Sequence, residues 1–303
     1  MMSKYKLYMG SWCFAFGFPT PASLETVVKV LSAFGFDGIA LGAGFSSHAA
    51  PEQFPTKESR TALVDMISSH NLEIAGYAPD PYCMPWATGP EEVLKEYKAY
   101  FESCLKMAHD VGAPVIRVDP GSFGPLARDA DYDVVWDRVV TTFKQQSKMA
   151  ADLGMGLRWE VETGQVFVKP SEVVKLIEEV DEDNFMLDYD CGHAQAVSVL
   201  AHNQVQPLEK CDEGQVGFIK MLNGKIGSVG INDCDNTTVM NEFATHLGLG
   251  KGVLDYDLII PALIESGYKG PWWAVDAIPM SPDVWTDAWN GREQLSALLD
   301  KYL

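Results

Sequence analysis

Short β-rich runs alternate regularly with longer segments of helical spacing along the 303 residues of this chain. This alternation is the feature that most constrains the fold, because it favours parallel pairing of the strands. The strands are expected at residues 6–12, 37–42, 72–78, 114–120, 156–162, 184–190, 226–233 and 271–277. The helices are expected at 23–34, 58–70, 91–112, 132–154, 170–180, near 207–222, 255–267 and 286–302.

The expected helix ends carry residues that are typical of helix boundaries. Pro170 stands at a first-turn position, and a glycine follows several helices shortly before the next strand, as a C-cap residue does. These glycines are Gly35, Gly112, Gly154 and Gly267. Eight strand–helix units predict an α/β fold, a closed (β/α)8 TIM barrel forming a single domain over residues 1–303. A doubly wound open sheet is the alternative, but residues 41–49 match its glycine-rich phosphate turn poorly.

Composition and charge exclude several classes of function. Apolar residues make up 47% of the chain, which is enough for a large core, but no apolar run is long enough to span a membrane. The start of the chain lacks the apolar stretch of a signal peptide, and the six cysteines show no close pairing. We therefore expect a cytoplasmic protein with reduced thiols and no membrane partner. A net charge of −19 argues against a nucleic-acid partner, while a homo-oligomer stays open.

Acidic and polar residues fall at the ends of the expected strands. In a TIM barrel these ends meet at one rim, where the active site lies. The residues are Asp119, Glu162, Asp190 with His193 just beyond it, Asn232, Asp233 and Asp276. Carboxylates and imidazoles around one point are ligands for a divalent cation. An isolated Asp-x-x-His pair is more often structural, but together with Glu162 and Asp276 it predicts a metal site.

Three segments resemble the xylose isomerase-like barrel superfamily, which comprises sugar isomerases and epimerases, cyclitol dehydratases and abasic-site endonucleases. They are GLRWEVETG, FMLDYDCGHA and GLGKGVLDYDLIIPALIESGYKGPWWAVD, and the resemblance covers nearly the whole chain. It implies a metal-binding glutamate at Glu162 and a metal-binding aspartate at Asp190, with a substrate-contacting histidine at His193. It also implies a glutamate at the end of strand eight, where Asp276 is one methylene shorter.

The chain departs from the family pattern in strand seven. The family has a metal-binding histidine there, in a motif similar to H-x-K-D, and the aligned position here is Gly230. Three carboxylates and water could still hold Mn²⁺ or Mg²⁺, whereas Zn²⁺ is less suited to a site without nitrogen ligands. His246, on the loop after strand seven, could substitute, but we favour a hydrated loop histidine or a supporting role.

Two further acids are expected one layer deeper in the barrel. Asp188 lies two residues before Asp190 on the same face of its strand, and Glu160 precedes Glu162 in the same way. Buried carboxylates need compensation, so Arg117 is expected to point inward and pair with Glu160, Asp188 or both. Alternatively, Asp188 faces outward against a helix.

The rim is also expected to carry residues that bind substrate. The candidates are His193, Trp12, Arg117 and Asn232. Aromatic residues near the rim could stack on a sugar ring; they are Trp12, Phe14, Tyr77, Tyr82, Trp86 and Phe167. The proline-rich loop at 78–90 is long enough to form a lid.

These features favour a divalent-metal-dependent isomerase or epimerase acting on a keto-sugar or related polyol. The cation polarises the carbonyl, and Glu162 or Asp276 removes the neighbouring C–H proton. Loss of a leaving group would instead make the protein a lyase or dehydratase of a keto-glycoside or inosose. The other alternative is a non-catalytic carbohydrate-binding protein that has lost the strand-seven histidine. An abasic-site endonuclease is disfavoured by six scattered histidines and the charge of −19.

Overall fold

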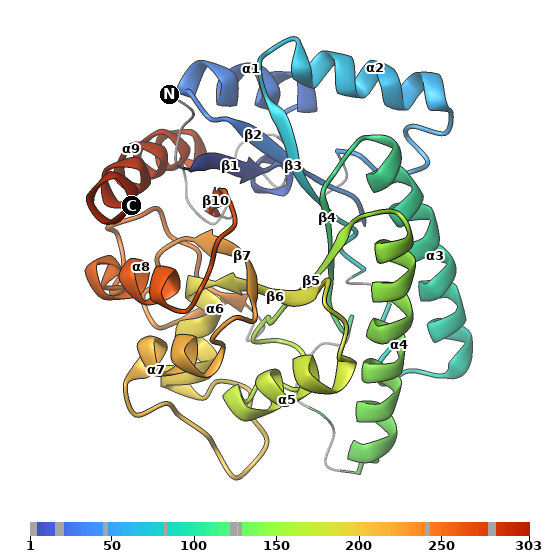
Figure 1. Cartoon of the computed structure of the whole chain (residues 1–303), viewed down its shortest axis with the longest axis vertical. Coiled ribbons are helices and arrows are strands. Elements are labelled where there is room, and N and C mark those ends of the chain that lie inside the picture. The colour runs from blue at the N-terminus through green and yellow to red at the C-terminus, as the bar shows by residue number, and fades with distance from the viewer. Residues whose placement is uncertain are drawn as a thin grey trace.

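A computed structural model describes residues 5–15, 21–44, 48–81, 84–121, 126, 129–239, 243–277 and 283–303. Within these residues, eight parallel strands close into a barrel in the order β1-β10-β7-β6-β5-β4-β3-β2 (Figure 1). The strands are β1 (Lys6–Gly10), β2 (Gly38–Gly42), β3 (Glu73–Ala78), β4 (Val115–Val118), β5 (Gly156–Glu160), β6 (Phe185–Asp190), β7 (Ile226–Ile231) and β10 (Trp272–Val275). The predicted (β/α)8 barrel is therefore confirmed.

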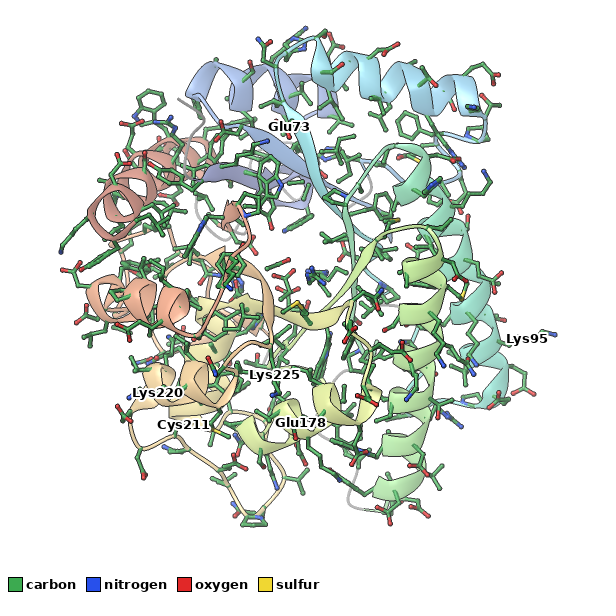
Figure 2. The ribbon with its side chains drawn as sticks, in the orientation of Figure 1. Glu73, Lys95, Glu178, Cys211, Lys220 and Lys225 are labelled. Carbon is green, nitrogen blue, oxygen red and sulfur yellow. The ribbon has the colours of Figure 1, made fainter. Side chains whose placement is uncertain are left out.

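Helices surround this barrel (Figure 1). They are α1 (Leu24–Phe34), α2 (Lys57–Ser68), α3 (Glu91–Asp110), α4 (Tyr132–Asp152), α5 (Pro170–Val180), α6 (Cys191–Gln195), α7 (Gly214–Met221), α8 (Tyr256–Glu265) and α9 (Val284–Tyr302). Charged side chains such as Lys95 on α3 project away from the barrel (Figure 2). Within the described chain, no helix combines the length and hydropathy needed to cross a bilayer.

Local sequence explains where the helices begin and end. The side chain of Ser23 caps α1 by accepting from the Thr26 amide, and Pro170 occupies the first turn of α5. The four glycines predicted as C-caps all adopt positive φ, between 71° and 90°. The helix expected near 207–222 begins only at Gly214.

Several short elements were not predicted from the sequence. They are the 3₁₀ segment η1 (Ser11–Phe14), α6, the π-helical segment η3 (Ala196–Leu200) and the antiparallel pair β8 (Thr238–Val239) and β9 (Phe243–Ala244). Each is five residues or shorter and lies outside the regular alternation of strands and helices, so no repeated pattern marks it. All but η3 contribute residues near the rim of the barrel or lead into them.

Alternating residues of each barrel strand face opposite sides. On β6, Leu187 and Tyr189 are buried in the hydrophobic core outside the barrel, whereas Asp188 and Asp190 face the interior. The register pairs Glu160 with Asp188 and Asp190 with Gly230. The acids predicted on neighbouring strands therefore share the inner face.

The barrel interior also holds Arg158, an arginine that was not predicted there from the sequence. Arg158 donates from Nη1 to the carbonyl oxygens of Leu157 and Asn184, both at 3.0 Å. Glycine at position 227 leaves the space for it, since a Cβ there would lie 2.5 Å from Arg158 Nε. Burial raises the pKa of Asp188 to about 6, although Arg117 and Arg158 act to lower it. Asp188 thus lies among interior charges, and the alternative that it faces an outer helix is wrong.

Candidate active site

Three carboxylates converge at the carboxyl ends of the strands. Glu160 ends β5, Asp190 ends β6 and Asp276 directly follows β10, and all three are buried. One oxygen from each lies within 4.8 Å of the others. Such a group of buried acids is costly unless a cation or hydrogen bonds compensate it. The structure therefore brings Asp190 and Asp276 together, as expected from the sequence.

Glu162 is not part of this group, and Glu160 takes the place on β5. The strand ends two residues earlier than expected, so Glu162 lies in the loop beyond it. Glu162 is 2% exposed, and its Oε2 accepts a 3.1 Å hydrogen bond from Gln165 Nε2. The Nη2 atom of Arg117 lies 4.0 Å from its other oxygen. Glu162 is thus a buried, oriented carboxylate beside the group of three.

Arg117 lies inside the barrel and forms an ion pair with Glu160, as predicted. Its second partner is Asp80, which follows β3 with a φ of +49° and was not identified from the sequence. Nothing in the local pattern marks Asp80, because it falls within the proline-rich loop and outside any strand. One guanidinium on β4 thus compensates acids from the two strands that flank it, β3 and β5.

Gly230 faces the space between two of these carboxylates. A Cβ at this position would lie 3.1 Å from Asp190 Oδ2 and 3.6 Å from Asp276 Oδ2. The strand-seven register inferred from the sequence is therefore confirmed. Asn232, two residues further, donates from Nδ2 to Asp190 Oδ2 at 2.5 Å. Its Oδ1 has no hydrogen-bond partner among the described residues.

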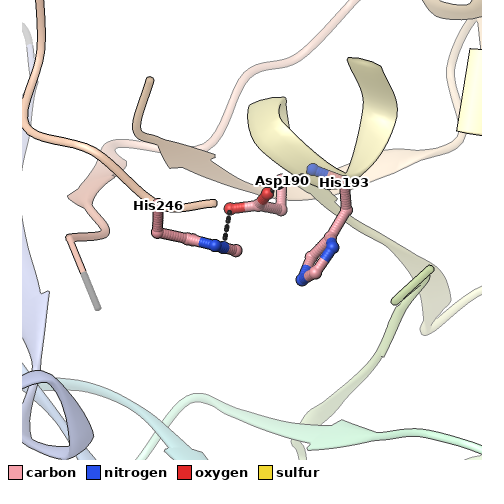
Figure 3. A group of neighbouring side chains, drawn as sticks. All are labelled: Asp190, His193 and His246. Atoms are coloured by element: carbon pink, nitrogen blue, oxygen red, sulfur yellow. Dashed lines mark hydrogen bonds and ion pairs between the residues drawn. The ribbon is translucent and has the colours of Figure 1, made fainter. Parts of the chain in front are cut away.

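His246 lies in the site, which corrects the expectation of a hydrated loop histidine. The side chain is 2% exposed, and its Nε2 lies 3.4 Å from Asp190 Oδ2 (Figure 3). Its Nδ1 lies 2.7 Å from the carbonyl oxygen of Ala244 and donates to it. Burial acts to lower the pKa of His246, but the charge of Asp190 outweighs it and raises the pKa to about 9.

His193 lies on the other side of Asp190 (Figure 3). Its backbone N–H donates to Asp190 Oδ1 at 2.8 Å, because Asp190 caps α6. Its ring centroid is 4.8 Å from that of His246. Burial lowers the pKa of His193 to about 3, which keeps the ring neutral, and its Nδ1 has no partner within the described structure. Asp190, His193 and His246 form a second group of possible ligand atoms within 4.8 Å.

The segment after β7 is held in place by the carboxylate of Asp233. This buried side chain accepts from the amides of Cys234, Gly250, Gly252 and Leu254 at 2.9–3.1 Å. The backbone of Asp233 also pairs with Leu247, next to His246. The loop that carries His246 is therefore fixed at both ends. The glycine-rich run at 248–252 is the sequence feature that marks the turn after His246.

Replacing Asp233 with alanine should destabilise the protein by about 3 kcal/mol or more, because four amides lose their acceptor. The measurement is the free energy of unfolding in urea. Asp235→Ala is the matched control, since Asp235 is exposed and, among the described residues, its side chain accepts only from Thr237 and Thr245. Its cost is expected to be about 1 kcal/mol or less. Equal costs for the two variants would contradict the role given to Asp233.

The segment η1 forms one wall of the site. Trp12 Nε1 and Cys13 Sγ each lie 3.4 Å from Asp276 Oδ1. The guanidinium of Arg117 lies 5.7 Å from the centre of the Trp12 ring. Burial raises the pKa of Asp276, partly offset by His246. Trp12 was expected here, whereas Cys13 was not, because no spacing pattern singles out a lone cysteine.

Other residues expected near the rim have different surroundings. Phe14, Tyr77 and Trp86 are buried in the core; Trp86 stacks on Tyr97 and donates to the carbonyl of Asp119. The carboxylate of Asp119 accepts from the Gly121 amide, and burial raises its pKa to about 6. Tyr82 lies outside the described residues, and the lid function of 78–90 stays a prediction.

The donor set fits a divalent cation. It offers carboxylate oxygens from three strands and one imidazole nitrogen, and these ligand types suit Mn²⁺, Mg²⁺ or Zn²⁺ to different degrees. The Nδ1–H of His246 is bonded to a backbone carbonyl, as is usual for a histidine that binds a metal through Nε2. His246 offers a nitrogen donor beside Asp190, whereas Gly230 has no side chain to offer one.

Comparisons with known proteins agree with this architecture. A family model described as xylose isomerase-like TIM barrel matches residues 28–291. An inosose dehydratase of Erwinia tasmaniensis is 24% identical, over 84% of this chain and 82% of that protein. An uncharacterized protein of Methanocaldococcus jannaschii is 22% identical, over 82% and 78%.

Solved structures show the same fold. A D-tagatose 3-epimerase-like protein superposes with a TM-score of 0.74 at 17% identity, over 98% of both chains. The IolI protein, solved with a bound zinc atom, has a TM-score of 0.74 at 15% identity, over 98% of this chain and 99% of its own. At these identities the likeness concerns the fold.

Proposed function

The chain belongs to the xylose isomerase-like TIM-barrel family, and on that premise we propose that it is an enzyme that isomerises or epimerises a keto-sugar or related polyol. The reaction begins with removal of a proton next to a carbonyl. The observation that supports this most strongly is the convergence of Glu160, Asp276 and His246 on Asp190. This arrangement combines ligands for a cation with carboxylates that can accept a proton.

Glu160, Asp190, Asp276 and His246 are the proposed ligands of a divalent cation. The sequence favours Glu162 for the position on β5, but the grouping of oxygen atoms favours Glu160. Mn²⁺ and Mg²⁺ remain the proposed ions, and the nitrogen of His246 also makes Zn²⁺ chemically suitable. When bound, such an ion polarises the carbonyl of the substrate and makes the neighbouring C–H more acidic.

Glu162 and Asp276 are the proposed bases. Gln165 donates from Nε2 to one oxygen of Glu162 and thereby orients it. Asp276 is a buried carboxylate that directly follows β10. These two carboxylates, which follow β5 and β10, allow a proton to be removed by one and returned by the other.

The remaining residues at the rim would bind and orient the substrate. The neutral ring of His193, with a buried and unpartnered Nδ1 among the described atoms, can exchange a hydrogen bond with a sugar hydroxyl. Trp12 offers an aromatic surface next to Asp276, and Asn232 carries a free Oδ1 within the described structure. The proposed partner is therefore a small sugar or polyol.

The test is solvent deuterium exchange at the carbon next to the carbonyl. Ketoses and inososes are incubated with the protein and Mn²⁺ in D₂O and followed by NMR, and a sample treated with chelator serves as the control. We expect exchange that depends on the metal. Metal binding with no exchange across the panel would favour the alternative of a non-catalytic carbohydrate-binding protein.

A lyase or dehydratase is the second candidate, favoured by the relatives named inosose dehydratase. It shares the first step, because a carbanion next to the carbonyl can also expel a leaving group. Product analysis of the same samples separates the two. A new stereoisomer identifies an epimerase, whereas loss of water or of a glycosidic group identifies a lyase.

A further inference from the structure

One guanidinium nitrogen in the barrel faces two carboxylates. Nη2 of Arg117 forms the ion pair with Asp80 Oδ1, and the same atom lies 4.0 Å from Glu162 Oε1. The neighbouring nitrogen, Nη1, pairs with Glu160. The guanidinium is therefore held close to Asp80 and Glu160 and at a distance from Glu162.

The distance between Arg117 and Glu162 affects how well Glu162 can act as a base. A carboxylate in a close pair with a guanidinium is stabilised in its charged form and accepts a proton less readily. Glu162 is buried, and its Oε2 accepts from Gln165 Nε2 at 3.1 Å. Oε1 is the oxygen on the side of Arg117, and it would lose basicity if the guanidinium moved onto it.

Backbone contacts fix Asp80 where it can hold this guanidinium. Its φ of +49° lies in the left-handed region, which aspartate and asparagine adopt more readily than most residues. Tyr100 Oη donates to the carbonyl oxygen of Pro79 at 2.5 Å, and the Ala43 amide donates to that of Ala78 at 2.8 Å. The side chain of Asp80 is 3% exposed. Its direction is therefore set by the segment that carries it.

Gly44, after β2, allows a second loop to pack against this segment. A Cβ at Gly44 would lie 2.3 Å from the carbonyl oxygen of Asp80 and 2.7 Å from that of Pro79. The close approach helps to keep Asp80 in its left-handed conformation. Residues that are held in such conformations by their surroundings cluster at functional sites, which suggests that Asp80 does more than fill space.

Charge compensation alone does not account for Asp80. The Arg117 guanidinium already has Glu160 as a partner. Its charge also acts to lower the pKa of three other carboxyl groups, those of Asp119, Asp188 and Asp276. Asp80 adds a direction, because it follows β3 whereas Glu162 follows β5, and these strands flank β4 on opposite sides. Asp80 therefore draws Nη2 away from Glu162.

We infer that Asp80 is a positioning residue of the proposed reaction, which holds the Arg117 guanidinium away from Glu162 and so keeps Glu162 available as the base. The inference rests on the proposed function, in which Glu162 removes the proton next to the carbonyl. Asp80 acts only through Arg117. When the charge of Asp80 is removed, Nη2 turns to Glu162 Oε1.

The first test is the variant Asp80→Asn. Asparagine keeps the size of the side chain and tolerates the positive φ, while the charge that holds Nη2 is lost. On the substrate that the parent accepts, we expect kcat to fall about tenfold or more because the base is weakened. KM and the Mn²⁺ affinity should stay close to the parent values, since the proposed ligands are unchanged.

Asp110→Asn is the matched control. Asp110 pairs with the buried Arg60, between α3 and α2 on the outside of the barrel (Figure 1). The substitution removes the same charge beside another buried arginine, far from the carboxylates. This control should keep the kcat of the parent.

A double-mutant cycle separates positioning from a general structural role. In the Arg117→Gln background, Asp80→Asn should lower kcat by no more than about twofold, because the side chain through which Asp80 acts is absent. A residue that only supports the fold would cost as much in either background. An equal loss in both backgrounds would therefore overturn the inference.

A crystal structure of Asp80→Asn gives a readout that does not depend on turnover. The distance from Arg117 Nη2 to Glu162 Oε1 should shorten from 4.0 Å to about 2.7–2.9 Å. A distance that stays near 4.0 Å, or a kcat equal to that of an active parent, would overturn the inference. If the parent turns over no sugar, the proposed function fails, and this distance still decides whether Asp80 positions Arg117.

Discussion

Turnover should fall by about 10²–10⁴-fold when Glu162 is replaced by glutamine, with the fold retained. The replacement is nearly isosteric, so it removes the charge and basicity of a side chain that is otherwise well packed. Gln165 can still bond to the new amide oxygen. The measurement is the rate of deuterium exchange or of product formation on the substrate that the parent protein accepts. Turnover within a few-fold of the parent would show that Glu162 is not the base.

Glu160→Gln is the matched variant, two residues earlier at the end of β5. Here the expected loss is in metal affinity, because Glu160 lies in the group with Asp190 and Asp276. Glu162→Gln should bind Mn²⁺ nearly as tightly as the parent. Calorimetric titration of Mn²⁺ into both variants separates the role of metal ligand from that of base. The melting temperature of each variant shows whether loss of the Arg117–Glu160 ion pair destabilises the fold. The reverse pattern, with metal affinity lost only in Glu162→Gln, would restore Glu162 as the ligand.

The second large effect concerns the histidine that reaches the site from a loop. His246→Ala should weaken Mn²⁺ or Zn²⁺ binding by tenfold or more, equivalent to about 1.4 kcal/mol. A second substitution, at Gly230, should restore the lost metal affinity. Gly230 faces the same carboxylates, so Gly230→His in the His246→Ala background returns an imidazole to the strand. We expect this double variant to recover most of the lost affinity.

Two controls make the histidine experiment decisive. Gly230→Ala measures the effect of filling the space at position 230 without adding a ligand. Its methyl group would lie 3.1 Å from Asp190 Oδ2, so the Asp190 side chain would have to shift slightly. His202→Ala removes a histidine that is outside both ligand groups. If His246→Ala binds metal as tightly as the parent, His246 is not a ligand. If only the rescue fails, the imidazole at position 230 cannot reach the ion.

The barrel could be predicted because its pattern is local and repeated. The main helices are long enough to show their own periodicity, the strands recur at regular intervals between them, and glycines such as Gly35 and Gly267 mark the helix ends. The closure of the sheet then follows from eight units of the same kind. Asp190 and Asp276 were found because a barrel brings the ends of its strands together. Arg117 was found because buried acids require a nearby positive charge.

The parts that escaped prediction depend on irregular backbone. The position of His246 is set by β9 and by the amides that Asp233 binds, and neither has a periodic pattern. Asp80 lies in the loop after β3, where its own backbone is left-handed, and from there it forms its ion pair with Arg117. The choice between Glu160 and Glu162 depends on where β5 ends, and strand ends are the least certain feature of a sequence pattern.

The most direct test of the account is titration of divalent cations into the chelator-treated parent protein and into Asp190→Asn. Asp190 belongs to both groups of ligand atoms, and it contacts His246 and Asn232 as well. Asparagine keeps its size and removes its charge. The account predicts saturable binding of one Mn²⁺, Mg²⁺ or Zn²⁺ ion per parent chain and a loss of affinity of tenfold or more in the variant. No binding to the parent, or equal binding to both proteins, would contradict it.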